Sequence, residues 1–374
     1  MNENKENEMR MLENKYNELK EKINKLDENK KDKYKDEINL IYEIEKEGTY
    51  NIFVEKFVEN NKNNIELNIN GNKSKLVNKY KLKKGNNEIK MIIKNKITNL
   101  QYMFYECNKL KNINELKYFN TKYCNNYSYM FYGCSLLSDI KGLEKWNVSN
   151  VNNFQAMFKD CSSLSDIKGL EKWNVSNVNN FLAMFYQCSS LSDINPLENW
   201  NLSNANNFSY MFYGCSSLSD IKGLEKWNVS NVNNFRAMFY QCSSLSNIKP
   251  LEKWNVSNAN NFQSMFNKCS SLSDIKPLEK WNVPNVNNFS GMFNECSSLS
   301  DIKGLEKWNV SKSNNFSYLG CSSLQNIKAL QNWNVSNCNN FSYMFYGCSL
   351  LSDIKELEKW NISKGNNFES MFNK

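Results

Sequence analysis

The sequence lacks several residue types and patterns on which enzymes rely. It contains no histidine, which is a common general base near neutral pH and the commonest metal ligand. Glycine and proline number only 13 and 4, and the phosphate-binding patterns GxGxxG and GxxxxGK do not occur. Without a recognisable catalytic constellation, we expect a protein that is not an enzyme and that has no cofactor and no metal site.

Long apolar runs are also missing. No stretch approaches the ~20 consecutive apolar residues of a transmembrane helix, so we expect no integral membrane segment. The first ten residues, MNENKENEMR, are polar and charged and lack the apolar core of a secretory signal. The sequence as written therefore indicates a cytoplasmic location by default.

Acidic residues are scarce between residues 51 and 100. This region has 11 lysines and 4 glutamates, a net charge of +7, whereas the whole chain carries +8. A basic surface can attract nucleic acid or an anionic membrane. Because the region contains no arginine and no recognisable nucleic-acid-binding fold, we favour a solvated face and expect no nucleic-acid partner.

Residues 1–35 are rich in charge and have helical periodicity. Their apolar residues are spaced alternately three and four apart, at Met9, Leu12, Tyr16, Leu19, Ile23 and Leu26. This spacing predicts a charged helix with a coiled-coil seam shorter than three heptads. Two interpretations remain open, a weak self-association element and a frayed tail.

The periodicity changes to two in residues 36–98. Ile38, Leu40, Tyr42 and Ile44 alternate with mostly polar residues, and Asn70-Gly71 and Gly85-Asn86 are typical of turns. The pattern predicts a small antiparallel β module that covers the first unit of the region that follows.

From residue 99 the chain repeats itself. A Met-Phe pair recurs every 27 residues from Met103 to Met292, and after a unit shortened by two residues (NNFSYLGC) it resumes at Met344 and Met371. All nine tryptophans and ten of the twelve cysteines occupy fixed repeat positions. Such spacing indicates about ten stacked 27-residue units over residues 99–374 that share one interior.

Within a unit, apolar residues recur about every third position. The spacing from Val178 to Cys188 predicts a short helix, and the LSDI segment at Leu191–Ile194 predicts a short strand that stacks in parallel on its neighbours. We expect the tryptophans to form a buried file along the stack. The predicted fold class is an α+β repeat solenoid with a charged N-terminal helix and a small antiparallel β module.

The repeated string NVSNVNNFxAMFxxCSSLSDIKGLEKW resembles the BspA-like leucine-rich repeats, over about residues 99–374. The resemblance implies a leucine-rich-repeat solenoid used for adhesion or protein binding, without catalytic activity. It also implies a surface location and a protein partner or a host or cell-surface ligand. The chain differs from many members in lacking a visible secretion signal or anchor.

The cysteines never form a CxxC pair, so the sequence does not encode a zinc cluster. A ladder of disulfides between neighbouring units is conceivable. We favour buried free thiols, since Cys161 and its equivalents end an apolar segment and Cys124 and Cys338 stand where other units carry Val or Ala.

Two further polar files run through the units. The Asn-x-Ser triplets, such as the one at Asn174, resemble glycosylation sequons, but we favour an asparagine ladder that satisfies backbone groups at a turn and caps the helix. The aspartates, such as Asp166, lie near lysines, and we favour a lattice of acid–base pairs between units over a calcium ladder.

Specificity for a partner must lie where the units differ. The differences cluster on the outer face of the predicted helix and at its end, and exposed tyrosine is a good anchor for a protein partner. The predicted partner-binding face consists of Gln155, Tyr186, Gln187, Tyr210, Tyr213, Arg236, Tyr240, Gln241 and Gln263.

The last unit stops at Met371-Phe372-Asn373-Lys374, before its Cys-Ser-Ser-Leu segment. Repeat stacks normally close with a polar cap, so this end is expected to expose apolar surface. The alternative function is therefore a structural protein that self-associates or polymerises through its uncapped C-terminal unit.

Overall fold

The computed structural model describes residue 18 and residues 37–373. The helix predicted for residues 1–35, with its short coiled-coil seam, lies outside the described residues except for Glu18, which is helical. Within the described part, no helix combines the length and the apolar character that a bilayer span requires.

The N-terminal module is built on a five-stranded sheet in the order β4-β3-β6-β1-β7. Its strands are β1 (Glu37–Ile44), β3 (Ile65–Ile69), β4 (Asn72–Lys75), β6 (Gly85–Ile93) and β7 (Leu110–Asn112), and the strands β2 (Gly48–Asn51) and β5 (Lys79–Leu82) form a separate pair. These strands pair in antiparallel fashion throughout. The small antiparallel sheets predicted from the period-two pattern are thereby confirmed.

The sheet buries the apolar residues that alternate with polar ones along β1. Ile38, Leu40, Tyr42 and Ile44 of β1 are all buried, because successive side chains of a strand point to opposite faces. The turn at Asn70-Gly71 joins β3 and β4 with φ values of 49° and 89°, which are typical of the left-handed conformation of a tight hairpin.

One element of the module was missed by the sequence analysis. The helix α2 (Glu55–Asn61) buries Phe57, whose ring lies 5.8 Å from that of Phe53. Two aromatic residues four apart in a stretch flanked by strands gave only a weak helical signal. The module therefore combines sheet and helix.

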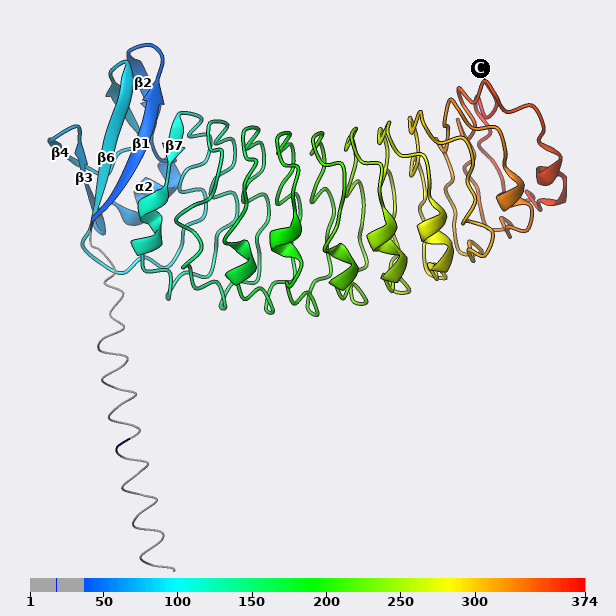
Figure 1. Cartoon of the computed structure of the whole chain (residues 1–374), viewed down its shortest axis with the longest axis horizontal. Coiled ribbons are helices and arrows are strands. Elements are labelled where there is room, and N and C mark those ends of the chain that lie inside the picture. Colours follow the sequence, from blue (N-terminus) through cyan, green and yellow to red (C-terminus); the bar gives the residue numbers. More distant parts are fainter. Residues whose placement is uncertain (1–17, 19–36, 374) are drawn as a thin grey trace, which may run out of the picture.

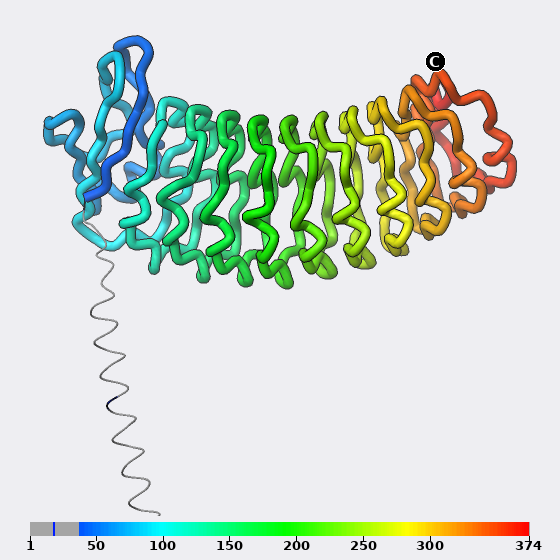
Figure 2. The backbone as a smooth tube through the Cα atoms, in the orientation of Figure 1, coloured from blue at the N-terminus to red at the C-terminus, as the bar shows by residue number. Residues whose placement is uncertain are grey.

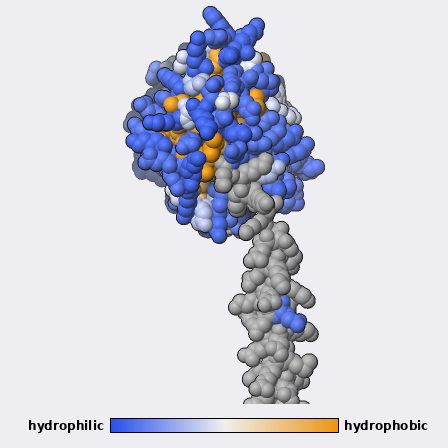
Figure 3. Space-filling view, turned by 90° about the vertical axis from the view of Figure 1, so that its left-hand side faces the viewer, coloured by the Kyte–Doolittle hydropathy of each residue, from blue (hydrophilic) through white to orange (hydrophobic). Residues whose placement is uncertain are grey.

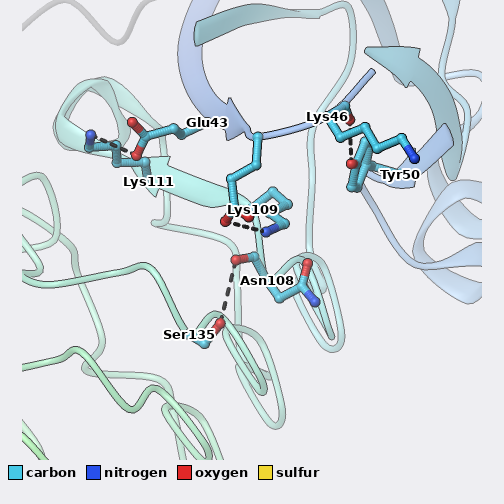
Figure 4. Close-up of polar contacts among 8 residues, drawn as sticks. Glu43, Lys46, Tyr50, Asn108, Lys109, Lys111 and Ser135 are labelled. Atoms are coloured by element: carbon cyan, nitrogen blue, oxygen red, sulfur yellow. Dashed lines mark hydrogen bonds and ion pairs between the residues drawn. The ribbon is translucent and has the colours of Figure 1, made fainter. Parts of the chain in front are cut away.

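The module and the first repeat form a continuous structure. Strand β7, which belongs to the first repeat, pairs with β1, and the backbone N–H of Glu43 donates to the carbonyl of Lys109 at 2.9 Å. The ion pairs Lys109–Glu45 at 3.1 Å and Lys111–Glu43 at 2.8 Å reinforce this junction (Figure 4). The Phe53 and Phe104 rings join the two interiors at 5.5 Å.

The repeats stack one upon another in an elongated body (Figures 1 and 2). Isolated parallel bridges join equivalent residues of consecutive repeats, for example Asn180 with Asn207 and Asn207 with Asn234. The interior is continuous, and all nine tryptophans are buried, with exposed fractions of 2–8%. The predicted shared interior with its file of tryptophans is confirmed.

The short helix predicted for Val178–Cys188 is wrong. This segment, here called the turn segment, consists of consecutive turns in which Ala183 and Gln187 adopt left-handed φ values of 56° and 57°. The N–H groups of Phe181, Ala183, Phe185 and Gln187 donate to carbonyls of the next repeat at 2.6–3.1 Å rather than along a helix. Because Met184 and Cys188 each bond back three residues, the turns bury every third or fourth residue, as a helix would.

Helical structure occurs elsewhere in the repeats, as short 3-10 helices around the Leu-Glu-Lys segment. They are η1 (Asn114–Tyr118), η2 (Leu170–Lys172), η3 (Asn195–Leu197), η4 (Leu224–Lys226), η5 (Lys249–Lys253), η6 (Lys276–Lys280), η7 (Lys328–Leu330) and η8 (Lys355–Lys359). The LSDI segment forms no full strand at Leu191–Ile194; equivalent segments make single bridges, such as Asp220 with Asn247. Each repeat thus relies on turns where the sequence predicts a helix and a strand.

Side chains tie each repeat to the preceding one. The indole N–H of Trp173 donates to the carbonyl of Leu143 at 2.9 Å, and the Cys161 thiol donates to the carbonyl of Phe131 at 3.0 Å.

All twelve cysteines are buried and free, which confirms the interpretation as buried thiols. Burial raises the pKa of each thiol, to about 12 for Cys107.

The polar files have a simpler role than predicted. Asn174 accepts the backbone N–H of Ser176 at 3.2 Å and so stabilises a turn, but no helix follows for it to cap. Asp166 likewise accepts the N–H of Lys168 at 2.9 Å. The ion pairs between repeats use glutamate, as in Lys280–Glu252 at 2.6 Å, so the predicted aspartate lattice between units is wrong.

Candidate interaction surface

The turn segment determines which side chains reach solvent. Alternate residues direct their N–H groups to the next repeat, and the Phe and Met side chains fill the interior. Residues such as Leu182 and Tyr186 lie between them and are half-buried. Since each repeat has the same backbone path, equivalent outward side chains form rows along the stack.

The most regular row is a column of stacked tyrosines, here called the tyrosine column. Its members are Tyr105, Tyr132, Tyr186, Tyr213 and Tyr240, with Lys159 at the same repeat position. The ring centroids are 4.5 Å apart for Tyr105–Tyr132, 4.3 Å for Tyr186–Tyr213 and 4.4 Å for Tyr213–Tyr240, with interplanar angles of 2–9°. Such parallel contacts leave ring edges and hydroxyl groups as the parts that face solvent.

Lys159 bridges the gap in the column. Its ammonium group lies 4.2 Å from the ring centre of Tyr186 and 5.3 Å from that of Tyr132. A cation over an aromatic face is attracted by the ring quadrupole. The lysine therefore continues the column across a repeat that has no tyrosine there.

A second, shorter row flanks the column. Tyr210 stands where other repeats carry Ala183 or Ala237, and its ring centre lies 6.1 Å from that of Tyr213. The guanidinium of Arg236, which is exposed, lies 5.5 Å from the Tyr210 ring. These contacts bring Tyr210, Arg236 and the column into one surface.

The predicted glutamines occupy different places on this surface. Gln155 is half-buried and donates its amide to the Tyr129 hydroxyl at 2.5 Å, whereas Gln187 packs against Gly214, where an added Cβ would lie 2.6 Å from the Gln187 Cδ. Gln241 is exposed and Gln263 half-buried. Gln155 and Gln263 share a row but are four repeats apart, so the structure places them along one surface without bringing them together.

Two hydroxyl groups of the column, those of Tyr132 and Tyr213, hold their protons firmly. The pKa of Tyr132 is raised to about 12, first by burial and then by the neighbouring Asp160 carboxylate as a hydrogen-bond partner. Burial also raises the pKa of Tyr213, with Tyr186 and Tyr240 adding to the effect. These groups are therefore neutral near pH 7 and can both donate and accept hydrogen bonds.

Tyr105, Tyr132 and Lys159 belong to the column but are not among the residues predicted from the sequence. The prediction rests on differences between the later repeats, and these three residues lie in the first three. Aligning the first three repeats with the others would have revealed all three.

Within the described residues, no group of three Asp, Glu or Cys side chains is placed to hold a metal ion.

The repeat region matches a known protein family. A family model described as "Mycoplasma protein of unknown function, DUF285" matches residues 98–221, 138–247, 216–322 and 272–374, which together cover the whole repeat region. The chain belongs to the DUF285 family. The tyrosine column lies within these DUF285 matches.

Two further comparisons were informative in different ways. No curated protein matches the chain. Among solved structures, a leucine rich cell surface protein from Faecalibacterium prausnitzii A2-165 is similar at 16% identity and a TM-score of 0.31, with 68% of this chain and 77% of that chain covered. The binding role of the nine predicted residues remains a prediction.

Proposed function

We propose that the chain is a non-enzymatic scaffold for protein interaction or adhesion. In this proposal residues 99–374 form a leucine-rich-repeat solenoid of the BspA-like type, and the module of residues 36–98 covers its first unit. The surface formed by the tyrosine column, Tyr210 and Arg236 contacts a protein partner or a cell-surface ligand.

The observation that carries this proposal is that the column is not needed for stacking. Asn267 and Asn294 replace tyrosine in two later repeats, yet the backbone ladder continues there, from Gln241 N–H to the Asn267 carbonyl at 2.7 Å and from Lys268 N–H to the Asn294 carbonyl at 2.8 Å. Tyrosine supplies a large contact area with little rotamer entropy and a polar tip. A row of tyrosines that the fold does not require is typical of a binding surface.

The test is site-specific photocrosslinking in cells that produce the protein. A photoreactive phenylalanine analogue replaces Tyr213 in one variant and Lys172, an exposed residue of η2, in the control. We expect a covalent adduct with another macromolecule at position 213 and none at position 172. Adducts of equal yield at both positions, or none at position 213, would contradict the proposal.

Self-association is a second candidate, favoured by apolar exposure near residue 370. Ile354, Ile362, Phe368 and Phe372 have exposed fractions of 39–46%, in contrast to the buried equivalents in central repeats. We expect sedimentation velocity to show concentration-dependent association that Ile362→Asp weakens. A strict monomer over the accessible concentration range eliminates this candidate.

A further inference from the structure

A continuous basic stretch lies in the N-terminal module. Residues 67–87 contain six lysines and no acidic residue. The lysines lie in β4, in β5 and in the turn that leads to β6, so residues 72–84 are here called the basic segment. This segment shares no residue with the tyrosine column.

The sheet order places β4 away from the repeats. In the order β4-β3-β6-β1-β7, β4 and β7 are opposite edges, and β7 belongs to the first repeat. Four strand spacings amount to about 19 Å. Figure 1 accordingly shows β4 at the end of the molecule remote from the stack, and Figure 3, which views that end, shows a mostly hydrophilic surface with a smaller apolar area.

Most of the charge of the basic segment is unneutralised. Lys81 pairs with Glu47 at 2.7 Å. Lys73, Lys75, Lys79 and Lys84 are exposed, and none of them forms an ion pair within residues 37–373. Lysines on an edge strand also discourage pairing with strands of other molecules. This role explains the lysines of β4 but not Lys79 and Lys84, which lie outside that strand.

The side chains of the basic segment are better suited to binding a negatively charged surface than to recognising a nucleic-acid base sequence. It contains no arginine, the residue that reads guanine and holds phosphate in a bidentate manner, and lysine acts as a point charge. Val77 and Tyr80 lie between these lysines in the sequence; both pack against the hydrophobic core and remain partly exposed. Tyrosine with an apolar body and a polar tip is enriched at membrane–water interfaces.

We propose that the basic segment binds an anionic phospholipid surface. The lysines are attracted to the lipid phosphates, and the exposed parts of Val77 and Tyr80 contact the boundary between headgroups and acyl chains. Because β4, which carries Lys73 and Lys75, is the sheet edge opposite the repeats, binding at this edge leaves the tyrosine column uncovered.

Vesicle co-sedimentation of the full chain tests this proposal. The probes are vesicles of phosphatidylcholine alone and vesicles that also contain about one third phosphatidylglycerol. One variant combines Lys73→Gln, Lys75→Gln, Lys79→Gln and Lys84→Gln. A control variant removes the same charge from exposed lysines of the repeats through Lys141→Gln, Lys168→Gln, Lys222→Gln and Lys276→Gln.

We expect the wild type and the control to bind only the anionic vesicles. Each lysine removed from the basic segment should weaken binding about fivefold, so the quadruple variant should lose at least a hundredfold. Binding should fall steeply as salt is raised. Circular dichroism verifies that both variants are folded, and acetylation footprinting of the wild type should show vesicles protecting Lys73, Lys75, Lys79 and Lys84.

Three outcomes would overturn the proposal. Equal losses in the two quadruple variants would attribute binding to net charge alone. Tighter binding of duplex DNA than of vesicles at equal phosphate concentration would assign the segment to nucleic acid. Failure of the wild type to sediment with anionic vesicles at low salt would exclude a membrane surface.

Discussion

At the residue scale, buried side-chain donors connect each repeat to the one before it. The Trp227 indole N–H donates to the Leu197 carbonyl at 2.9 Å, and the Cys215 thiol donates to the Phe185 carbonyl at 3.2 Å. Both acceptors lie in the interior, and each also accepts a backbone N–H, from Trp200 to Leu197 and from Cys188 to Phe185, at 3.1 Å. A tryptophan or a cysteine in the repeat therefore contributes a hydrogen bond as well as packing.

The indole bond gives the first prediction. Trp227→Phe removes the indole donor, but the Leu197 carbonyl still accepts the backbone N–H of Trp200 at 3.1 Å. We therefore expect the lost hydrogen bond to lower the free energy of unfolding by about 0.5–1.5 kcal/mol, with a further loss from the smaller ring. Urea denaturation measures this change in the free energy of unfolding. Trp360→Phe, at the more exposed last tryptophan (8% exposed), is the comparison and should cost less. Equal stability of Trp227→Phe and wild type would contradict the role of this bond.

The thiols give a prediction about pH. Burial raises the pKa of Cys107 and Cys124 to about 12 and that of Cys338 to about 11, above the 9.0 of an ordinary thiol. Because the unfolded chain loses these protons first, it binds fewer protons than the folded chain between about pH 9 and pH 12. Stability should therefore be fully present below pH 9 and be lost as pH rises toward 12.

Two measurements check this. Denaturation at a series of alkaline pH values should show a stability that falls above pH 9, and iodoacetamide at pH 8 should label the unfolded chain but not the native one. Cys348 should be the first to react, since its exposed fraction of 5% is the largest among the twelve buried thiols. Rapid labelling of the native protein would show that the thiols are accessible.

At the scale of the element, the turn segment is the unit that the fold repeats. It includes left-handed positions that most residues adopt at a cost, such as Gln241 with φ 59° and Ala237 with φ 51°. Glycine occupies the position of Gln241 in some repeats, for example Gly214 with φ 70°. The repeat tolerates this strain because the ladder of backbone bonds fixes the conformation.

Glycine substitution tests this strain. Gln241 is exposed, so Gln241→Gly should raise the free energy of unfolding by up to about 1 kcal/mol, because relief of the left-handed strain exceeds the added entropy of the unfolded chain. Gln263→Gly is the matched control, since Gln263 is not among the residues with positive φ, and it should lower stability by about 0.5–1 kcal/mol. Thermal or urea denaturation measures both; effects of the same sign would refute the explanation.

At the scale of the whole molecule, the shortened repeat interrupts the row of stacked phenylalanines inside the otherwise continuous interior. Phe266 and Phe293 stack at 5.9 Å and Phe345 and Phe372 at 5.5 Å, but the unit between them has Leu319 and Gly320 and no equivalent phenylalanine. A Cβ on Gly320 would collide with the carbonyl oxygen of Tyr346. The glycine therefore allows the backbone of the shortened unit to approach its neighbour closely.

This interruption predicts uneven stability along the stack. In repeat proteins stability depends on interfaces between neighbours, so the repeats after residue 321 should open at lower free energy than those between residues 130 and 290. Hydrogen exchange measured by mass spectrometry should show faster exchange for residues 325–372. Uniform protection across both regions would indicate that the missing phenylalanine is compensated.

Much of the architecture could be predicted because it depends on repetition. The fixed spacing of Trp173 and Cys161 identified the stacked units and the buried thiols, and the alternation in β1 identified the sheet. The helix predicted for Val178–Cys188 was wrong because turns that bond back three residues bury the same positions as a helix. For the candidate surface, the sequence selected Tyr186, Tyr213 and Tyr240, but their stacking required the backbone path.

The sequence by itself determined the period of the repeat, the residues that form the shared interior and the two regions of distinct periodicity. These are consequences of which residues are apolar and how far apart they recur. Only the tertiary structure decided that the turn segment bonds to the next repeat, that β7 joins the module to the stack and that β4 forms the opposite edge of the sheet. Those features depend on which distant backbone groups pair, and apolar spacing along the chain does not specify these partners.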